Sequence, residues 1–236
     1  MINGLLLIDK PKGWTSFDVV AKVRGIIKAE VRKSNPTIKN IKVGHTGTLD
    51  PAATGLLVLC IGKATKRVPE LIKHDKTYEV EITLGATSTT DDQEGDITQR
   101  LGVVEPHFDR VQKVIKEYIG EQMQVPPQFS ALKINGKKAY ELARKGKSVD
   151  LKARPVTIHR IDDMKYHWPT IHFKAHVSSG TYIRSLARDI GESLGCGAYM
   201  SNLRRTHIEN YNITDAVNVE ELNWDVISST IMDTSI

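Results

Sequence analysis

Residues 44–61 read GHTGTLDPAATGLLVLCI, and the two halves of this stretch have opposite character. The second half, residues 55–61, is an unbroken apolar run that must be buried, as either a strand or a helix. Residues 44–55 contain three glycines, at 44, 47 and 55, which let the backbone take positive φ and let a ligand approach closely. Asp50 precedes Pro51 and is therefore biased toward an extended conformation that presents its carboxylate. We expect chemistry on this loop, carried by a buried element.

Two interpretations of Asp50 remain open on local grounds. A carboxylate on a shaped loop is a candidate nucleophile or general base. Alternatively, Asp50 caps a helix over residues 52–61, a position that aspartate favours. A phosphate cradle is a third option, but the stretch lacks the Gly-Lys-Ser/Thr ending of a P-loop and the spacing of a dinucleotide fingerprint. The sequence therefore argues against ATP and NAD as ligands.

The flanking segments contain strands and helices in irregular order. Upstream, we expect a strand over residues 4–9, a turn over residues 10–13, a helix capped by Ser16 with apolar spacing through Ile27, and a polar loop over residues 28–40. Downstream, alternation predicts a strand over residues 78–84, followed by a polar loop over residues 85–95.

The rest of the chain adds helices over residues 109–119 and 138–145 and strands over residues 154–161 and 171–177. A further helix, over residues 181–194, is expected to be capped by Thr181 and ended by Gly195. No βαβ unit repeats along the chain. The sequence predicts the α+β class, with a mixed, mostly antiparallel sheet flanked by helices.

Composition excludes several classes of protein. The chain has 236 residues, with 33 Lys and Arg against 28 Asp and Glu. No apolar run is long enough for a membrane span or a secretory signal. Two cysteines, Cys60 and Cys196, are too few for a disulfide framework or a four-thiolate zinc site. We expect a cytoplasmic protein that does not contact a membrane.

Charge is distributed unevenly along the chain. The segments 22–42 and 133–160 are strongly basic, whereas residues 209–236 contain acids and no Lys or Arg. Such basic blocks fit a polyanion whose phosphates they contact. Two solvated basic faces without a partner remain the alternative at this point.

A second unusual segment is Ser179-Gly180-Thr181-Tyr182-Ile183-Arg184, where a strand runs into a helix. A cation near a helix N-terminus opposes the macrodipole, so Arg184 calls for an anionic partner such as a phosphate or a carboxylate. The alternative is a surface arginine beside a core tyrosine.

Two other groups give weaker signals. His172 and His176 share one face of a predicted strand, but a third zinc ligand is missing. The acidic loop over residues 91–96 lacks the spacing of an EF-hand, and a solvated, flexible loop is the simpler interpretation. We therefore predict no metal site.

Several collinear motifs together resemble the tRNA pseudouridine synthases of the TruB family. They are GLLLIDKPKGWTS (4–16), GHTGTLDPAATG (44–55), KTYEVEITLG (76–85), PPQFSALKINGKKAYELARKG (126–146), SSGTYIRSLARDIGESLGCGA (178–198) and NLRR (202–205). The resemblance implies the pseudouridine synthase catalytic fold. It also implies an isomerase that converts the uridine at position 55, in the T loop of tRNA, to pseudouridine without a cofactor or metal.

The resemblance assigns roles residue by residue. It implies that Asp50 is the catalytic carboxylate, that Arg184 pairs with it, and that Tyr182 lies near the sugar. The implied substrate-binding residues are His45, which takes the place vacated when the RNA loop opens, Tyr78, which stacks on the flipped uracil, Leu203, which lines the uracil pocket, and Lys10 and Lys12 in the basic loop. Covalent attack by Asp50 and a glycal route with Tyr182 as base both fit these residues.

The partner is expected to be the T stem-loop of tRNA, bound by a monomer that needs no guide RNA or protein partner. A non-catalytic tRNA-binding protein and a guide-dependent synthase are the rival hypotheses. We expect residues 1–236 to form a single catalytic domain, with 206–236 as a short acidic extension and without the PUA-type domain common in bacterial members. The loop GATSTTDDQEGD (85–96) keeps the Thr90, Asp92 and Gly95 of the family and otherwise departs from it.

Overall fold

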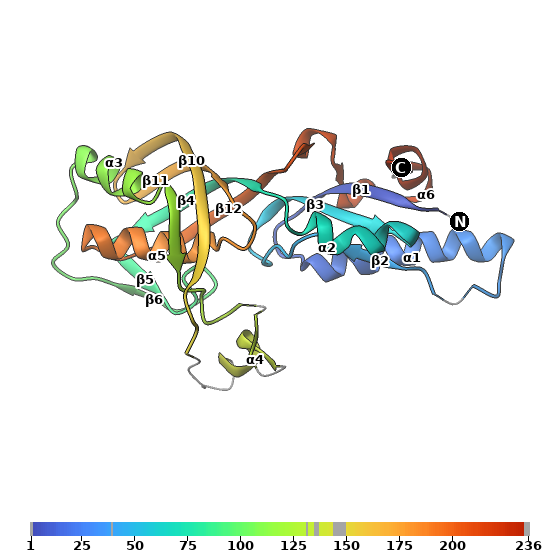
Figure 1. Ribbon diagram of the computed structural model, residues 1–236, viewed down its shortest axis with the longest axis horizontal. Helices are drawn as coiled ribbons and strands as arrows, with labels where there is room; N and C mark the ends of the chain where they lie inside the picture. The colour runs from blue at the N-terminus through green and yellow to red at the C-terminus, as the bar shows by residue number, and fades with distance from the viewer. Residues whose placement is uncertain (1, 39, 131, 135–136, 144–149, 234–236) are drawn as a thin grey trace. The chain divides into compact units, whose positions relative to one another are not determined.

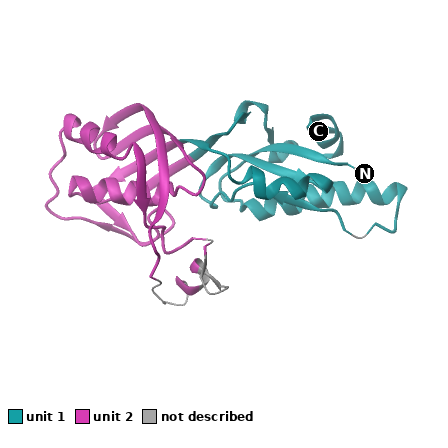
Figure 2. Cartoon of the chain, viewed as in Figure 1, with its two compact units in different colours: residues 1–78, 204–236 teal, residues 79–203 magenta. Residues whose placement is uncertain are grey.

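The computed structural model describes residues 2–38, 40–130, 132–134, 137–143 and 150–233 (Figure 1). The chain divides into two compact units, shown in Figure 2: unit 1 contains residues 1–78 and 204–236, and unit 2 contains residues 79–203. The chain leaves unit 1 within strand β4 (Lys76–Leu84) and returns to it within strand β12 (Ala198–Ile208). Each unit is described by itself.

Unit 1 is built on a long antiparallel ladder between β1 (Gly4–Lys10) and β3 (Thr54–Ile61). The apolar run at residues 55–61 is therefore a strand, and Asp50 does not cap a helix over residues 52–61, contrary to that alternative. Shorter strands complete the sheet: β2 (Val43–His45) antiparallel to β3, β14 (Val217–Asn218) parallel to β1, the end of β12 parallel to β3, and β13 (Tyr211–Asn212) antiparallel to β12.

Both faces of the β1–β3 ladder are buried, which explains why these strands are apolar without alternation. On one face, Leu6 and Ile8 pack with Leu57 and Leu59 against helix α1 (Ser16–Ser34), which lies along these strands in Figure 1. The opposite face packs against the short helices η1 (Gly62–Arg67) and α2 (Val68–Leu71). The remaining helices of unit 1 are η2 (Ile213–Asp215), η3 (Val219–Glu221) and α6 (Trp224–Thr230).

Helix α1 begins and ends at residues that the sequence pattern did not predict. Its N-cap is Thr15, whose side chain forms a reciprocal capping box with Asp18, so Ser16 is the first helical residue instead of the cap. The helix continues to Ser34, although a loop was expected from residue 28. Ile27 is the last fully buried residue of the helix, and Val31, one turn later, packs against the same core while partly exposed. The other residues of the last two turns are polar or small, and good helix formers among them carry the backbone to Ser34.

Unit 2 contains the sheet order β12-β4-β11-β10-β7, in which β7 (Gly120–Gln124), β10 (Arg154–His167) and β11 (Thr170–Val177) form antiparallel neighbours. Helix α3 (Phe108–Glu117) contacts both β10 and α5 (Ile183–Leu194). Two small hairpins and a short helix complete the unit: β5 (Ala86–Ser88) with β6 (Ile97–Gln99), β8 (Lys133–Ile134) with β9 (Lys137–Lys138), and α4 (Ala139–Ala143).

The start of α5 also differs from the prediction. Its N-cap position is Tyr182, not Thr181, and no side chain of that residue caps the helix. The amide of Gln124 binds the Tyr182 backbone instead, accepting from its N–H at 2.8 Å and donating to its carbonyl at 3.1 Å. The helix ends as expected at Gly195, with φ of 79°. Residues 144 and 145 of the predicted helix 138–145 lie outside the described residues.

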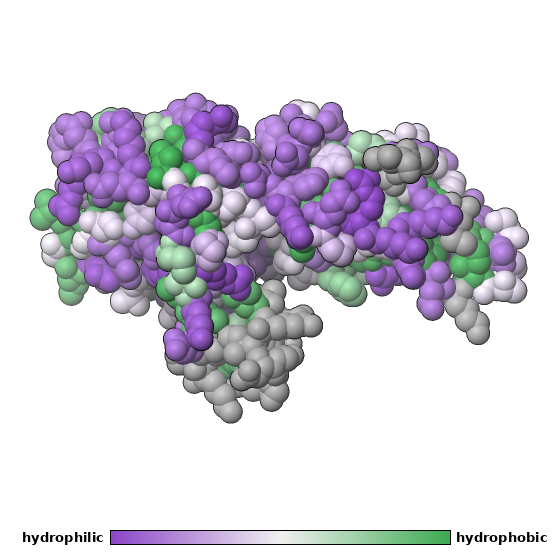
Figure 3. Space-filling model, viewed as in Figure 1, coloured by the Kyte–Doolittle hydropathy of each residue, from purple (hydrophilic) through white to green (hydrophobic). Residues whose placement is uncertain are grey.

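The α+β class and the mixed, mostly antiparallel sheet are confirmed. Hydrophilic side chains dominate the face of each unit that Figure 3 shows. Among the described residues, no helix is long and apolar enough to cross a membrane.

Two glycines in helices test opposite features of this packing. A Cβ at Gly25 of α1 would meet nothing within 4 Å, so Gly25→Ala is expected to raise the free energy of unfolding by about 0.5–1 kcal/mol through helix propensity.

At Gly191 of α5, a Cβ would lie 2.2 Å from the Ala198 nitrogen, so Gly191→Ala is expected to lower the free energy of unfolding by about 1–3 kcal/mol. Urea denaturation of both variants measures the two shifts, and equal shifts would contradict this packing.

Candidate functional site

His45 is the last residue of β2, and Asp50 lies on the segment between β2 and β3, whose backbone is bound by buried polar side chains. Ser16 is 2% exposed, and its hydroxyl accepts the Leu49 N–H at 2.8 Å and donates to the Leu49 carbonyl at 3.1 Å. A residue on the first turn of α1 thus fixes the backbone immediately before Asp50.

Lys10 holds the same segment on the other side of Asp50. Its side chain is fully buried, and its ammonium donates to the carbonyls of Pro11, Trp14 and Pro51, at 2.9, 2.7 and 3.4 Å. The Pro51 carbonyl also accepts the Gly13 N–H at 2.8 Å. Lys10 therefore joins the basic loop to the Asp50 segment inside the protein, whereas Lys12 of the same loop is exposed.

Arg205 on β12 fixes the segment at a third point. Its guanidinium is buried and donates from Nε to the Leu56 carbonyl at 2.7 Å and from Nη2 to the Gly47 carbonyl at 3.1 Å. Within the described part of the chain, no carboxylate lies at ion-pair distance from this cation. Arg205 therefore places an uncompensated positive charge beside the loop.

A second buried cation lies near Arg205. The Lys76 ammonium donates to the carbonyls of Ile72 and His74, at 2.7 and 2.6 Å. Burial, reinforced by the charge of Arg205, lowers the pKa of Lys76 to about 8. The interior beside Gly47 is thus electropositive, which favours neutral or anionic groups on this loop.

His45 lies close enough to Arg205 for its pKa to be affected by this positive charge. It is half-buried, and burial followed by the charge of Arg205 lowers the pKa of its imidazole. Its Nδ1 accepts the Gly47 N–H at 3.3 Å. A neutral imidazole with its proton on Nε2 follows, so His45 can contact a ligand through a hydrogen bond and not through a charge. The neighbouring Thr46 hydroxyl is buried without a hydrogen-bond partner.

The remaining predicted residues of unit 1 are Asp50 and Tyr78. Asp50 is half-buried and lies between Leu49 and Pro51, the two residues whose backbone groups Ser16 and Lys10 bind. Tyr78 occupies an inward-facing position of β4 and is 8% exposed. Unit 1 therefore carries Lys10 and His45 at the ends of β1 and β2, Asp50 on the segment that follows β2, and Tyr78 on β4.

Arg184, in unit 2, has the anionic partner that its position requires. The side chain is 5% exposed, and its Nη1 lies 3.5 Å from the Asp92 carboxylate, which is itself buried. The guanidinium also donates to the carbonyls of Thr90 and Phe129, at 3.3 and 3.0 Å. Unit 2 therefore fixes the planar head of Arg184 before any substrate binds.

The acidic loop around Asp92 is not the solvated, flexible segment that its composition indicated. Asp92 accepts hydrogen bonds from the Thr90 hydroxyl and from the Glu94 N–H, and Asp91 pairs with Arg188 at 3.0 Å. Burial raises the pKa of Asp91. Two arginines, one helical turn apart on α5, clamp two consecutive aspartates, a tertiary relation that the sequence pattern could not reveal.

Tyr182 and Leu203 also belong to unit 2. The Tyr182 backbone is fixed by Gln124, as described above, and its side chain is half-buried. Leu203 is 8% exposed on β12. The eight predicted site residues are thus divided, five in unit 1 and three in unit 2.

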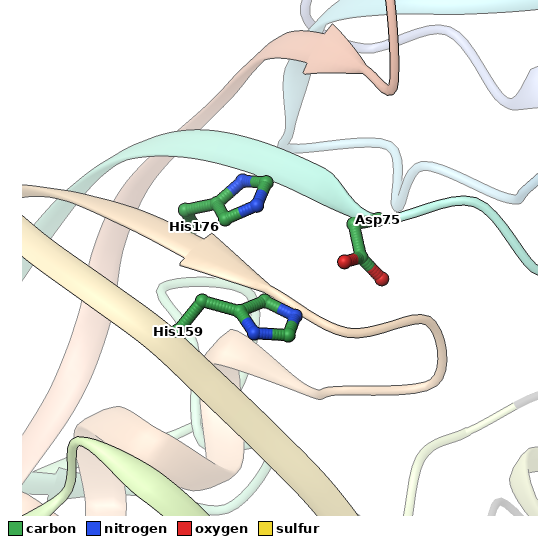
Figure 4. Close-up of side chains that lie close together, drawn as sticks. All are labelled: Asp75, His159 and His176. Atoms are coloured by element: carbon green, nitrogen blue, oxygen red, sulfur yellow. The ribbon is translucent and has the colours of Figure 1, made fainter.

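The histidines of β11 have separate neighbours. The His172 Nδ1 lies 3.5 Å from a Glu81 carboxylate oxygen, whereas the ring of His176 lies 5.0 Å from that of His159 (Figure 4). Asp75, also drawn in Figure 4, belongs to unit 1. The geometry gives no support to a metal ion shared by His172 and His176.

Sequence reasoning missed three residues that support this site. Ser16 was assigned to a helix cap, Arg205 was only part of a motif, and Asp92 belonged to a loop assigned to solvent. The available signal for Arg205 was a charged residue inside a strand of apolar character, but that pattern does not identify its partners.

Solved structures of other proteins resemble this chain along nearly its whole length. One, described as a Cbf5–Nop10–Gar1 complex, matches 93% of the chain with a TM-score of 0.68 and 29% identity. Another, described as an H/ACA RNP bound to a substrate RNA containing 2′-deoxyuridine, matches 93% with a TM-score of 0.66 and 27% identity. The chain spans about half the length of these solved chains, 53% and 52%.

Sequence comparison gives the family directly. Residues 33–183 match the model of the TruB family pseudouridylate synthase N-terminal domain, and residues 184–233 match that of the tRNA pseudouridylate synthase B C-terminal domain. A protein of Clostridium kluyveri named tRNA pseudouridine synthase B is 45% identical over 96% of this chain and 74% of its own length. One of the same name from Phocaeicola vulgatus is 44% identical over 92% of this chain and 90% of its own length. The chain therefore belongs to the TruB family of pseudouridylate synthases.

Proposed function

We propose that this protein is a tRNA pseudouridine synthase that converts the uridine at position 55, in the T loop, to pseudouridine. The observation that carries the proposal is the Asp50 loop, whose backbone is tied at residues 47, 49 and 51 by three buried side chains. Such preorganisation is what a catalytic carboxylate requires and what a solvated turn does not need. Family membership supplies the reaction class.

The target base is stacked within a folded RNA loop and must first be extruded. Tyr78 is the proposed platform for the flipped uracil. Stacking of one base on an aromatic side chain contributes about 1–3 kcal/mol, which offsets part of the stacking lost inside the RNA. Leu203 is the proposed apolar wall of the uracil pocket, and neutral His45 occupies the space that the extruded base leaves.

Asp50 must be ionised to act on the nucleotide. We infer from the family resemblance that Arg184 supplies the direct countercharge. The contact between Arg184 and Asp92 supports this role, because it holds the guanidinium in one orientation and leaves less side-chain entropy to be lost on binding.

The reaction is an isomerisation and needs no redox or group-donating cofactor. The C1′–N1 glycosidic bond breaks, the uracil turns while bound, and a C1′–C5 bond forms; N1 gains a proton and C5 loses one. Two routes suit the proposed residues. Asp50 attacks the nucleotide covalently, or it assists a glycal route in which Tyr182 removes the 2′ proton of the sugar.

The basic segments are proposed to contact the phosphates of the T arm. Arg32 and Lys33 lie exposed in the last turn of α1, and Lys12 is exposed on the basic loop. Such contacts position the RNA without reading its sequence, so specificity is left to the pocket. Parts of the second basic segment, including Lys145 and Lys147, lie outside the described residues.

We further propose a cytoplasmic monomer that acts without a guide RNA or protein partner. Both cysteines are buried thiols, which is compatible with a reducing compartment, and burial raises the pKa of Cys60 to about 11. A guide-dependent synthase is the alternative that the likeness to the Cbf5 and H/ACA assemblies raises.

Asp50→Asn is expected to abolish turnover and to leave tRNA binding intact, because the amide keeps the shape of the side chain and loses its charge. Turnover is measured as tritium release from tRNA labelled at uracil C5, since C5 loses its hydrogen when it joins the sugar. Binding is measured by filter retention. Release by Asp50→Asn at the wild-type rate would contradict the role of Asp50, and a silent wild type would refute the enzyme.

Arg184→Lys is expected to lower single-turnover tritium release by orders of magnitude, because lysine keeps the charge and loses the planar fork that binds two partners. The lysine variant is preferable to Arg184→Ala, which leaves buried Asp92 unpaired and lowers the free energy of unfolding by about 3–5 kcal/mol. Urea denaturation provides the control for folding. A folded Arg184→Lys protein with unchanged turnover would show that the fork is dispensable.

An isolated T-arm stem-loop is expected to be a substrate in the absence of any other protein or RNA. Its binding should weaken steeply with salt, and Lys12→Gln should reduce the slope of log Kd against log salt by about one. Filter binding between 50 and 200 mM salt measures the slope, as is usual for phosphate contacts. If turnover of the stem-loop requires an added guide or protein, the guide-dependent alternative replaces this proposal.

A further inference from the structure

One hydroxyl satisfies both backbone groups of the residue next to Asp50. Ser16 accepts from the Leu49 N–H and donates to the Leu49 carbonyl, although the two residues are 33 positions apart in sequence. Both residues are buried, Ser16 at 2% and Leu49 at 3% exposure. Leu49 belongs to no strand or helix, so the serine supplies the pairing that a neighbouring strand would give.

Ser16 is itself held rigidly. It occupies the first position of α1, between Thr15 and Asp18, and Val19 and Val20 anchor the same turn in the core of unit 1. Its short side chain has a single χ angle, so the hydroxyl cannot follow a moving loop. The position of Leu49 is therefore fixed by α1, and α1 is fixed in turn by its packing against the sheet.

The next peptide unit carries Asp50. With Leu49 fixed by Ser16 and the Pro51 carbonyl fixed by Lys10 and by the Gly13 N–H, the backbone is held on both sides of the aspartate. The place from which the Asp50 side chain projects is thereby set by the backbone. The contact that fixes the residue directly before Asp50 depends on a single atom, the hydroxyl oxygen of Ser16.

We propose that Ser16 is a positioning residue for Asp50: its hydroxyl sets the place of the catalytic carboxylate without touching the substrate. This inference rests on the proposed function of Asp50. A misplacement of about 1 Å in a reacting group costs on the order of 10²-fold in rate. Loss of the hydroxyl should therefore lower the rate of the chemical step and leave RNA affinity unchanged.

Ser16→Ala is the direct test, and Thr15→Ala is its matched control on the same helical turn. Thr15→Ala removes the cap and lowers the free energy of unfolding by about 1 kcal/mol, but Thr15 makes no contact with Leu49 in the hydrogen bonds described for it. Single-turnover tritium release is expected to fall about 10- to 100-fold in Ser16→Ala and less than about twofold in Thr15→Ala. Filter binding should give the wild-type Kd for both.

A second measurement does not depend on activity. Hydrogen exchange of the peptide that contains Leu49 should accelerate in Ser16→Ala and stay at the wild-type rate in Thr15→Ala, because only the first variant frees the Leu49 N–H. Should the wild type release no tritium, the proposed function fails, whereas this exchange experiment still decides whether Ser16 holds the loop.

Ser16→Cys keeps the size of the side chain and only weak hydrogen-bonding capacity, so it guards against a variant that fails to fold. Its rate is expected between those of the wild type and Ser16→Ala. Full activity in folded Ser16→Ala or Ser16→Cys overturns the proposal. So does an equal loss of rate in Ser16→Ala and Thr15→Ala, because the effect would then follow stability.

Discussion

The ladder between β1 and β3 is the constraint on which the rest of unit 1 depends. Its register places Lys10, at the end of β1, opposite Gly55, at the start of β3. The loop that follows β1 and the loop that precedes β3 therefore lie at the same end of this strand pair. One loop leads to Ser16 and the other carries Asp50. Their contacts, from the Lys10 ammonium to Pro51 and from the Ser16 hydroxyl to Leu49, follow from that register. A shift of the pairing register by one residue would move the side chains of the shifted strand to the opposite face of the sheet. It would also separate the Lys10 ammonium from the Pro51 carbonyl and the Ser16 hydroxyl from Leu49.

Three cations are buried inside this unit and are satisfied by backbone carbonyls: Lys10, Lys76 and Arg205. Burying a charge is expensive even when its hydrogen bonds are made. Apolar residues of similar volume would give a core of equal or greater stability, so packing does not explain these choices. Two of the three bind carbonyls of the Asp50 segment, Lys10 at Pro51 and Arg205 at Gly47, and the charge of Arg205 adds to burial in lowering the pKa of His45. The same buried charges therefore cost free energy of folding and hold the segment that carries the proposed catalytic carboxylate.

Local patterns predicted the elements that are defined by burial and missed the features defined by tertiary partners. The apolar run at residues 55–61 had to be buried, but only its pairing with β1 made it a strand. Likewise, the predicted helix ended at Ile27, the last fully buried residue of α1, seven residues before the helix itself ends at Ser34. The candidate site was assigned by resemblance to a family and not by periodicity. Its supporting residues, Ser16 and Arg205, make contacts across 33 and 158 positions, which no local pattern encodes.

The two lysines of the basic loop illustrate how burial divides residues that a motif treats alike. Family resemblance assigns both Lys10 and Lys12 to substrate binding. The three donors of the Lys10 ammonium meet three carbonyls inside the protein, so a phosphate that approached it would have to displace bonds that hold the Asp50 segment. Lys12, two residues further along the same loop, is exposed. The proposed function therefore assigns attraction of the RNA backbone to Lys12 and the other exposed cations, and it assigns to Lys10 the positioning of the Asp50 segment.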